Sequence, residues 1–220
     1  MDSRRVYRHF CMMARALEIV GERWSLLVVR DLLLGPRRFT DLVRSLAEIT
    51  PTRLTNRLRE LEAAGVVTRE APSRGREVWY RLTEAGLNLG PVVDALTLWG
   101  IDHAFESPRA GEPSPPAPLM IGTKVSLSRH ASHLRRPLLW VWRFPADDAY
   151  TLRYEDGAWT LARGNAEAAD LIIETTLEAW ARFLSARGRR RLPRKDIRLQ
   201  GKAAAVKEFA RAFSAELRPS

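Results

Sequence analysis

The chain has 220 residues, a length that fits one large domain or two small ones. Hydrophobic residues make up 45% and charged residues 28%, a balance typical of globular proteins. The 36 Lys and Arg residues outnumber the 26 Asp and Glu residues, and only four of the basic residues are lysines. A basic excess of this size indicates nucleic acid, a membrane surface or an acidic partner.

The composition excludes several classes of protein. A single cysteine, Cys11, cannot form an internal disulfide or a thiolate zinc site, which excludes a disulfide-stapled secreted scaffold. The apolar runs around residues 26–34 are broken by Arg30 and Asp31 and are too short to span a bilayer. The first ten residues have no apolar signal-peptide core. We therefore expect a soluble, cytoplasmic protein.

The segment 106–119 is predicted to be a linker, because it holds five prolines and few apolar side chains. It separates a domain at 1–105 from a second domain at 120–220. Residues 1–105 carry 16 basic and 13 acidic side chains, whereas residues 106–220 carry 20 and 13. The densest basic block is 187–202; DNA, an anionic head group and a solvated loop are all open explanations for it. The total charge therefore does not locate a nucleic-acid site.

The first half of residues 1–105 is predicted to be helical. One helix should cover about 5–20, and a second should run from Glu22 to Leu34. Gly35 and Pro36 are typical of a helix end. Apolar residues occur on nearly every side of the second helix, which indicates a central, buried position.

Two further helices should follow, each with a threonine at its start. Thr40 is expected to N-cap a short helix at 41–48, and Thr50 should cap a helix at 51–65 with Pro51 in its first turn. The residues predicted to face inward are Leu42 and Leu46 in the first and Leu54, Leu58 and Leu61 in the second.

A hairpin and a last helix complete the first domain. Residues 66–72 and 76–83 alternate as strands, the turn at 73–75 contains Gly75, and a helix should follow at 84–105. From Glu22 on, three helices, a hairpin and a final helix follow one another, which is the order of a winged helix-turn-helix.

The helix at 51–65 carries outward residue types that read DNA. Arg can bond two guanine acceptors, Asn can do the same for adenine, and Thr can reach a base or a phosphate. A recognition helix contacts the major groove with its first turns, and arginines of a wing can neutralise phosphates. An ordinary solvated helix face is the alternative. The predicted DNA-binding residues are Arg37, Arg38, Thr40, Thr50, Thr52, Arg53, Asn56, Arg57, Arg74 and Arg76.

Motifs within residues 8–104 resemble the HxlR-type winged helix-turn-helix regulators. They are the helix around Trp24, the G-P-R-R-F turn at 35–39, the L-x-x-R-L-x-x-L pattern at 54–61 and the Y-x-L-T-x-x-G pattern at 80–86. The resemblance implies a homodimeric transcription regulator that binds a roughly palindromic double-stranded DNA operator. It further implies a dimer interface made by the first and last helices, here 5–20 and 87–104.

The resemblance also draws attention to the single cysteine. In some regulators of this type a cysteine near the N-terminus senses oxidants or electrophiles, and Cys11 lies at about that place. The neighbours Arg8, His9 and Arg15 favour the reactive thiolate. A free cysteine is, however, more often a small buried hydrophobe. Both interpretations stay open.

Residues 120–220 are predicted to be α+β. Strands are expected at 137–144, 149–155, 158–164 and 169–176, with a hairpin turn at Asp156-Gly157. A helix at 176–188, a short strand and a last helix should follow. We expect an antiparallel sheet with helices on one face.

This second domain resembles the sterol-carrier-protein-type lipid-transfer fold. The resemblance covers about residues 135–216 and includes the Y-x-L-R-x-x-D-G-x-W-x-L pattern at 150–161. It implies an apolar tunnel for a small hydrophobic ligand, whereas an ordinary aromatic core is the alternative. The candidate pocket residues are Trp140, Trp142, Trp159, Leu171, Ile173, Trp180, Phe183 and Phe209.

No catalytic constellation is found in the sequence. The four histidines are scattered, and His130 and His133 have no cysteine or nearby carboxylate to complete a metal site. We therefore expect no enzyme activity, no cofactor and no metal. The leading hypothesis is a dimeric regulator whose second domain binds a small apolar ligand. The alternatives are sensing through Cys11, or a carrier of hydrophobic compounds with secondary DNA binding.

Overall fold

The computed structural model describes residues 7–70, 77–104, 115–129, 134–145, 148–185 and 195–213, and the backbone of 190–191 and 215–216. The chain divides into two compact units, Met1–Val93 and Asp94–Ser220, here called the first and the second unit. The boundary lies within a helix and precedes the expected domain end at residue 105. In the described ranges no helix is long and apolar enough to cross a membrane.

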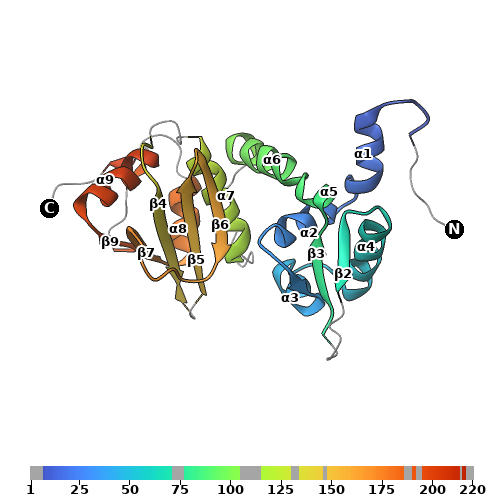
Figure 1. Cartoon of the computed structure of the whole chain (residues 1–220), viewed down its shortest axis with the longest axis horizontal. Helices are drawn as coiled ribbons and strands as arrows, with labels where there is room; N and C mark the ends of the chain where they lie inside the picture. Colours follow the sequence, from blue (N-terminus) through green and yellow to red (C-terminus); the bar gives the residue numbers. More distant parts are fainter. Residues whose placement is uncertain are drawn as a thin grey trace. The chain divides into compact units, whose positions relative to one another are not determined.

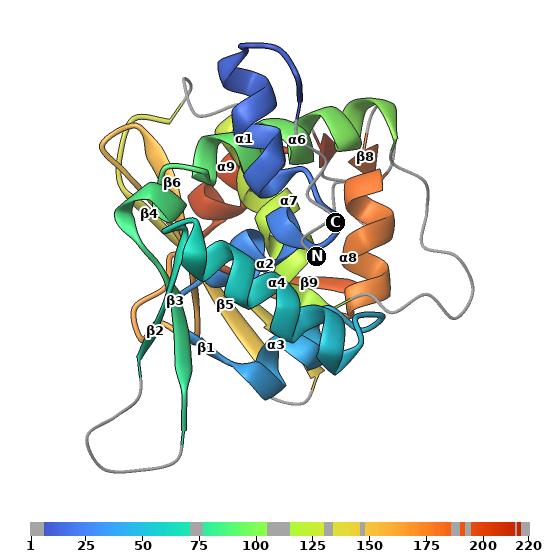
Figure 2. The same ribbon diagram turned by 90° about the vertical axis from the view of Figure 1, so that its right-hand side faces the viewer.

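The first unit follows the predicted order of helices and strands with two differences (Figure 1, Figure 2). The two-residue strand β1 was not predicted, and the helix predicted at 84–105 is divided into α5 and α6. β1, β3 and β2 form a three-stranded antiparallel sheet in that order. The helix-turn-helix with a following hairpin is therefore confirmed. The elements are α1 (Met12–Val20), α2 (Ser25–Leu32), β1 (Arg37–Arg38), α3 (Phe39–Ser45), α4 (Pro51–Ala63), β2 (Val67–Glu70), β3 (Trp79–Leu82), α5 (Glu84–Leu87) and α6 (Gly90–His103).

Several helix ends differ from the predicted ones. α1 starts at Met12 rather than near residue 5. α2 starts at Ser25 because the preceding Trp24 has a left-handed backbone with φ of 82°. It is buried as expected and ends at Leu32, just before the turn at Gly35, whose φ is 114°.

The start of α3 corrects the prediction for Thr40. The helix begins at Phe39, so Thr40 lies in its first turn and Arg38 occupies the N-cap position. The Asp41 carboxylate accepts a hydrogen bond from the Arg38 backbone N–H at 3.2 Å. The first-turn carboxylate thus bonds the backbone N–H of the N-cap residue, and its negative charge suits the positive end of the helix.

The cap and the inward stripe of α4 are confirmed. The Thr50 hydroxyl accepts the backbone N–H of Arg53 at 3.4 Å, and Pro51 lies in the first turn. Leu54, Leu58 and Leu61 are at most 2% exposed. They pack in one cluster with side chains of the neighbouring helices and the hairpin, namely Val28, Val29, Leu32, Leu42, Leu46, Val66 and Leu82.

The Y-x-L-T-x-x-G pattern at 80–86 connects the hairpin to the end of α4. The Thr83 hydroxyl donates to the Gly65 carbonyl at 2.6 Å and accepts the Gly86 N–H at 3.1 Å. A Cβ atom on Gly86 would lie 2.2 Å from the Val66 carbonyl oxygen. The glycine is therefore required for the close approach of α5 to the backbone that precedes β2.

The second unit contains a five-stranded sheet in the order β6-β5-β4-β7-β9. The four predicted strands, the short fifth strand and both predicted helices are confirmed, and Asp156 and Gly157 form the hairpin turn with φ of 51° and 83°. A separate parallel pair joins β8 and β10. The elements are α7 (Pro116–Ser128), β4 (Leu138–Phe144), β5 (Asp148–Glu155), β6 (Ala158–Arg163), β7 (Leu171–Thr175), α8 (Leu177–Ser185), β8 (Arg190–Arg191), β9 (Ile197–Gly201), α9 (Ala203–Ala212) and β10 (Ala215–Glu216).

The five-stranded sheet is mixed, which corrects the expectation of an antiparallel sheet. β4, β5 and β6 form an antiparallel meander, but β7 returns beside β4 and runs parallel to it. Asp170 starts this pairing. Its carboxylate accepts the Leu139 N–H at 2.9 Å, and its own N–H donates to the Leu139 carbonyl at 2.8 Å.

Helix α7 was not predicted, and its first residues correct the end of the proposed linker. The helix begins at Pro116, and Pro118 also lies in its first turn, where a backbone N–H has no partner to lose. Met120, Ile121, Val125 and Leu127 are buried. Residues 116–119 are thus packed rather than extended, and residues 105–114 lie outside the described part.

Replacing Gly86 by alanine should destabilise the first unit, because the new methyl group would overlap the Val66 carbonyl oxygen. We expect the free energy of unfolding to fall by roughly 1–3 kcal/mol, as measured by urea denaturation followed by circular dichroism. Gly122→Ala in α7 is the control, because no atom lies within 4 Å of its added Cβ. An equal loss in both variants would contradict this explanation.

Candidate functional site

α4 presents a continuous polar surface to solvent. Thr52, Asn56 and Arg59 are separated by four and three residues, so they share one side of the helix, and Arg53 lies beside them. All four side chains are exposed, and they lie opposite the buried leucine stripe. We call Thr52, Arg53, Asn56 and Arg59 the α4 polar face.

Arg57 is not part of this face, which corrects its predicted outward orientation. Its side chain is only 15% exposed, and its guanidinium is paired with Glu60 and with Glu22. An α-helix turns by about 100° per residue, which places Arg57 on the flank next to Leu54 and Leu61. The same rotation exposes Arg59, which is not among the DNA-binding residues predicted from the sequence.

Thr50 is exposed at the start of α4 and has two uses for its hydroxyl. The oxygen accepts the Arg53 N–H, which caps the helix. The hydroxyl proton is still available to donate to an acceptor such as a phosphate oxygen. Thr40 is likewise exposed, in the first turn of α3.

Arg38 is held by acidic partners from two elements. Its guanidinium donates to Asp41 in α3 at 3.2 Å and to Glu77 before β3 at 2.8 Å, and it lies over the Trp79 ring. Burial raises the pKa of the Asp41 carboxyl, but hydrogen bonds from the Arg38 guanidinium and backbone N–H outweigh it and lower that pKa below its usual value. Arg38 therefore ties α3 to the hairpin.

Arg37 is half-buried in β1, and no ion pair joins it to another described residue.

The hairpin is formed by β2 and β3, which pair antiparallel. Arg74 and Arg76 at its tip lie outside the described residues, so the structure gives no position for them.

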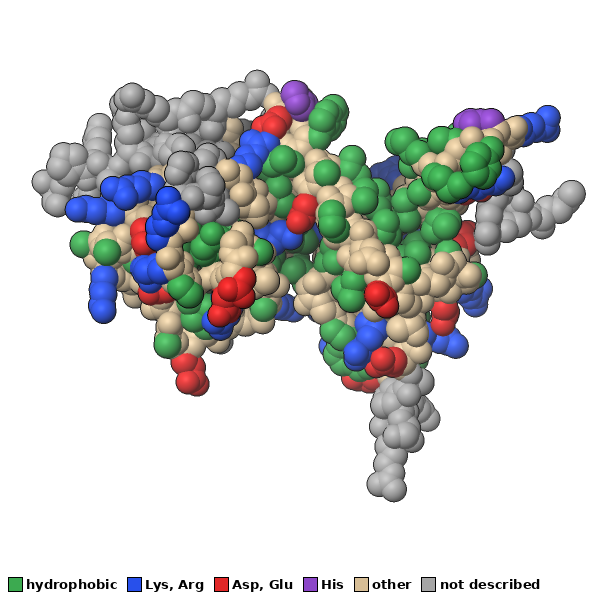
Figure 3. Space-filling model, turned by 45° about the horizontal axis from the view of Figure 1, so that its top comes forward, with side chains coloured by type: hydrophobic (Ala, Val, Ile, Leu, Met, Phe, Trp, Pro, Cys, Tyr) green, Lys and Arg blue, Asp and Glu red, His purple; other side chains and the backbone are tan. Residues whose placement is uncertain are grey.

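Two helices leave large apolar side chains exposed. Phe10 and Met13, at the start of α1, are 84% and 70% exposed, and Trp99 in α6 is 60% exposed. Met12, Val92 and Leu96 are exposed as well. Figure 3 shows hydrophobic side chains at the surface of these helices. Cys11 is half-buried at the N-cap position of α1.

The structure brings all eight candidate pocket residues together. They lie on the side of the five-stranded sheet that α7, α8 and α9 cover, and each is at most 5% exposed. Trp140 and Trp142 of β4 contact Phe209 of α9, and Trp142 also contacts Trp180 of α8. These residues form a packed aromatic cluster.

The indole N–H groups of this cluster differ in their hydrogen bonding. The Trp180 N–H donates to the Thr123 hydroxyl of α7 at 2.7 Å. The N–H groups of Trp140, Trp142 and Trp159 are buried and have no acceptor among the residues that the structure describes. A buried N–H without a partner costs roughly 1–3 kcal/mol.

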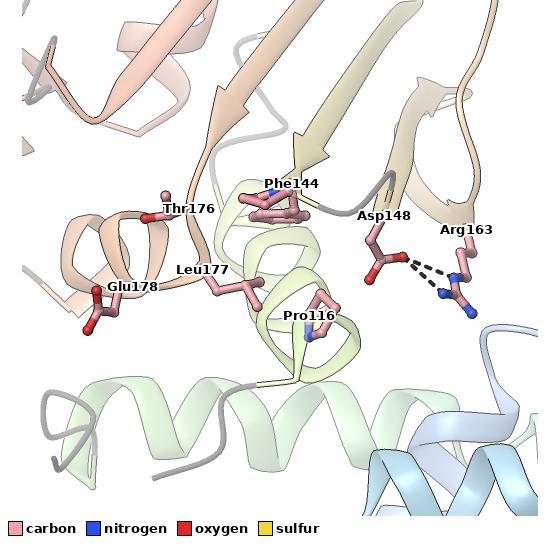
Figure 4. A pocket seen from close by; sticks show the side chains of 8 residues that line it. Pro116, Phe144, Asp148, Arg163, Thr176, Leu177 and Glu178 are labelled. Carbon is pink, nitrogen blue, oxygen red and sulfur yellow. Dashed lines mark hydrogen bonds and ion pairs between the residues drawn. The ribbon is translucent and has the colours of Figure 1, made fainter. Parts of the chain in front are cut away.

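A cavity of about 480 Å³ lies at the carboxyl end of β4 (Figure 4). Phe144 and Leu177 form its apolar wall, and the ion pair between Asp148 and Arg163, at 3.1 Å, lies on one side of it. The other lining residues are Pro116, Pro145, Thr176 and Glu178. A second cavity, of about 280 Å³, lies between the later part of α6, α7 and Leu184.

Within the described ranges, no three His, Cys, Asp or Glu side chains lie close enough to hold a metal ion. His130 and His133 lie outside those ranges. Of the basic block at 187–202, the side chains of 195–202 are described, and Arg198 there pairs with Glu174 at 3.7 Å.

Comparison with solved structures gives partial matches. The chain is 35% identical to a structure described as the redox regulator HypR in its oxidized form, with 42% of this chain and 97% of that chain covered and a TM-score of 0.41. It is 36% identical to the putative transcription factor PA1607, with 45% and 69% covered and a TM-score of 0.43.

Sequence comparison identifies the family. The HxlR-like helix-turn-helix profile matches residues 19–107. An uncharacterized HTH-type transcriptional regulator of Mycobacterium tuberculosis, Rv3095, is 46% identical over 90 residues, which are 40% of this chain and 56% of that protein. Another, of Methanothermobacter thermautotrophicus, is 36% identical over 108 residues, which are 49% of this chain and 82% of that protein. The chain therefore belongs to the HxlR-like helix-turn-helix family of transcriptional regulators.

Proposed function

We propose that this protein is a sequence-specific transcriptional regulator that reads a double-stranded DNA operator through the α4 polar face. The observation that carries the proposal is the exposure of Arg53, Asn56 and Arg59 on one side of a helix whose other side is buried. Arg and Asn are the side chains that bond guanine and adenine edges with two hydrogen bonds each. The proposed base-contacting residues of α4 therefore include Arg59, which was not predicted from the sequence, and exclude Arg57, which was.

Other residues of the first unit are proposed to fix the position of the protein on the DNA backbone. Contacts to phosphates set register and orientation without reading sequence. Arg37, Thr40 and Thr50 are available for such contacts at the starts of β1, α3 and α4, and Arg74 and Arg76 are proposed to act from the hairpin tip. Arg38 supports this arrangement through Asp41 and Glu77.

Arg53→Ala should lower the affinity for a selected operator duplex by about 5- to 150-fold, the loss expected for one bidentate base contact. Alanine keeps the backbone N–H that bonds to Thr50, so the helix cap survives. The affinity is measured by fluorescence anisotropy at a fixed salt concentration. Arg153→Ala is the control, because it removes an equal charge from an exposed position in the second unit. Equal affinities of Arg53→Ala and wild type would refute the assignment of α4.

We infer that the exposed apolar side chains of α1 and α6 are covered by a second copy of the chain. Each helix exposes large apolar groups, Phe10 and Met13 at the start of α1 and Leu96 and Trp99 on α6. The resemblance to HxlR-type regulators implies a dimer interface at these two helices. A symmetric dimer would place two α4 helices on two half-sites of one operator.

Leu96→Glu should shift the protein from dimer to monomer, because a carboxylate would have to be buried without a partner. Sedimentation velocity measures the change. Ala162→Glu, at an exposed position of β6, adds the same charge to the five-stranded sheet, outside α1 and α6, and should leave the dimer intact. A wild-type monomer, or a dimer that survives Leu96→Glu, would argue against this interface.

The second unit is proposed to bind a small apolar ligand. The support for this role is an aromatic cluster covered by α7, α8 and α9 beside a 480 Å³ cavity, a volume within the range of small-molecule sites. The resemblance to sterol-carrier-type domains points to the same class of ligand. Binding would change operator affinity only if the ligand favours one arrangement of the two winged helices over another. A carrier of hydrophobic compounds would bind the ligand without that change.

Sensing through Cys11 is a second candidate function, favoured by one observation. The thiol is half-buried at the N-cap position of α1, beside the exposed Phe10 and Met12 of the proposed interface. A modified Cys11 would therefore change packing between the two copies. Diamide should then weaken operator binding in wild type and leave Cys11→Ser unaffected; the same response in both proteins would exclude the role.

A further inference from the structure

Four buried tryptophans of the second unit differ in whether their indole N–H groups have a hydrogen-bond acceptor. The Trp180 N–H has a built partner in Thr123, whose hydroxyl in turn donates to the Leu119 carbonyl at 2.9 Å. Trp140, Trp142 and Trp159 lie on the same side of the sheet, and no described residue offers their N–H groups an acceptor. A phenylalanine would fill most of the same space without burying a donor. Ring faces accept N–H groups only weakly, so the neighbouring aromatic rings do not replace an oxygen acceptor.

Of these donors, Trp142 lies nearest to the cavity at Phe144 and Leu177, whereas Trp140 and Trp159 lie further along the sheet, toward the Leu138 end of β4. Side chains alternate along a strand, so Phe144, Trp142 and Trp140 project from the same side of β4. Leu177 and Trp180 are one helical turn apart on α8, and the Trp142 and Trp180 ring centroids are 5.4 Å apart. Figure 4 shows Phe144 and Leu177 side by side at the cavity wall. A molecule that displaced these two side chains would meet the Trp142 indole first.

The charges at the cavity select against an anion. The positive charge of Arg163 is already paired with Asp148, and the remaining charged group in the lining, Glu178, is negative. Most buried residues behind the cavity are aromatic or aliphatic, and the hydroxyls of the buried Thr123 and Thr175 are bonded within the fold. The carboxylate of a fatty acid would find no free cation there, whereas a neutral carbonyl oxygen would find indole donors.

We propose that the helix-covered side of this sheet binds a neutral, planar compound that carries a carbonyl oxygen, and that the Trp142 indole N–H donates to that oxygen. This inference rests on the ligand-binding role proposed above and names the chemical class of the ligand. The compound enters between Phe144 and Leu177, and Trp140 and Trp159 supply donors further inside. Trp142 is thus a specificity-determining residue of the site.

The test uses the full-length protein and two probes that differ in one group, 9-fluorenone, with a carbonyl, and fluorene, with a methylene. The measured quantity is the ratio of their dissociation constants, from titration calorimetry, in wild type, Trp142→Phe and Trp79→Phe. The preference for 9-fluorenone should fall by about 2- to 12-fold in Trp142→Phe, the loss of one neutral hydrogen bond. It should not change in Trp79→Phe, because Trp79 lies in β3 of the first unit, outside the proposed site.

A measurement on wild type alone covers the case in which Trp142→Phe does not fold. In protein with ¹⁵N-labelled tryptophan, 9-fluorenone should move one to three indole proton signals downfield, and fluorene should not. If both probes bind and the ratio of their dissociation constants is the same in all three proteins, the second unit binds apolar ligands but the inferred hydrogen bond to a carbonyl is overturned. If neither binds, both the inference and the proposed ligand role fall. The proposal for α4 is unaffected in either case, because it is tested by Arg53→Ala.

Discussion

The burial of Leu54, Leu58 and Leu61 fixes the rotation of α4 about its own axis, and every proposed base contact depends on that rotation. Once this stripe is packed against α2, α3 and the hairpin, the 100° turn per residue directs Asn56 and Arg59 to solvent and Arg57 to the flank. The two ends of the helix are held separately, by Thr50 at the start and by the hydrogen bond from Thr83 to Gly65 after its end. An apolar packing constraint thus determines which polar groups can meet DNA.

The net charge of the chain is a poor guide to the same site. Most of the basic excess belongs to residues 106–220, and several arginines there are used internally. Arg136 pairs with Asp170 and Glu208, and Arg163 pairs with Asp148. These ion pairs stabilise the start of β7 and one side of a cavity, so the arginines in them are not free to bind a polyanion. The candidate DNA surface is instead a small set of exposed side chains with particular spacings on α4.

Local signals in the sequence predicted much of the fold, and non-local packing explains what they missed. The Thr50 cap, the leucine stripe and the Asp156-Gly157 turn each depend on a few adjacent residues and were confirmed. The predicted Thr40 cap was wrong because the helix begins earlier, at Phe39, where the Asp41 carboxylate bonds the Arg38 backbone N–H. α7 was missed because prolines that start a helix also resemble a linker. The parallel β7 follows from a strand order that no local pattern contains. Whether a buried indole N–H has an acceptor likewise depends on side chains far apart in sequence, as with Trp180 and Thr123.

Backbone amide NMR of the full-length protein with a selected operator duplex locates the surface that meets the DNA. If α4 makes the base contacts, the largest chemical-shift changes upon binding will occur at residues 50–59, with smaller changes around Arg37 and Arg38. The amides of the five-stranded sheet in the second unit, such as that of Arg153, should stay unchanged. Changes confined to the second unit, with the amides of α4 unmoved, would exclude α4 as the DNA-binding helix.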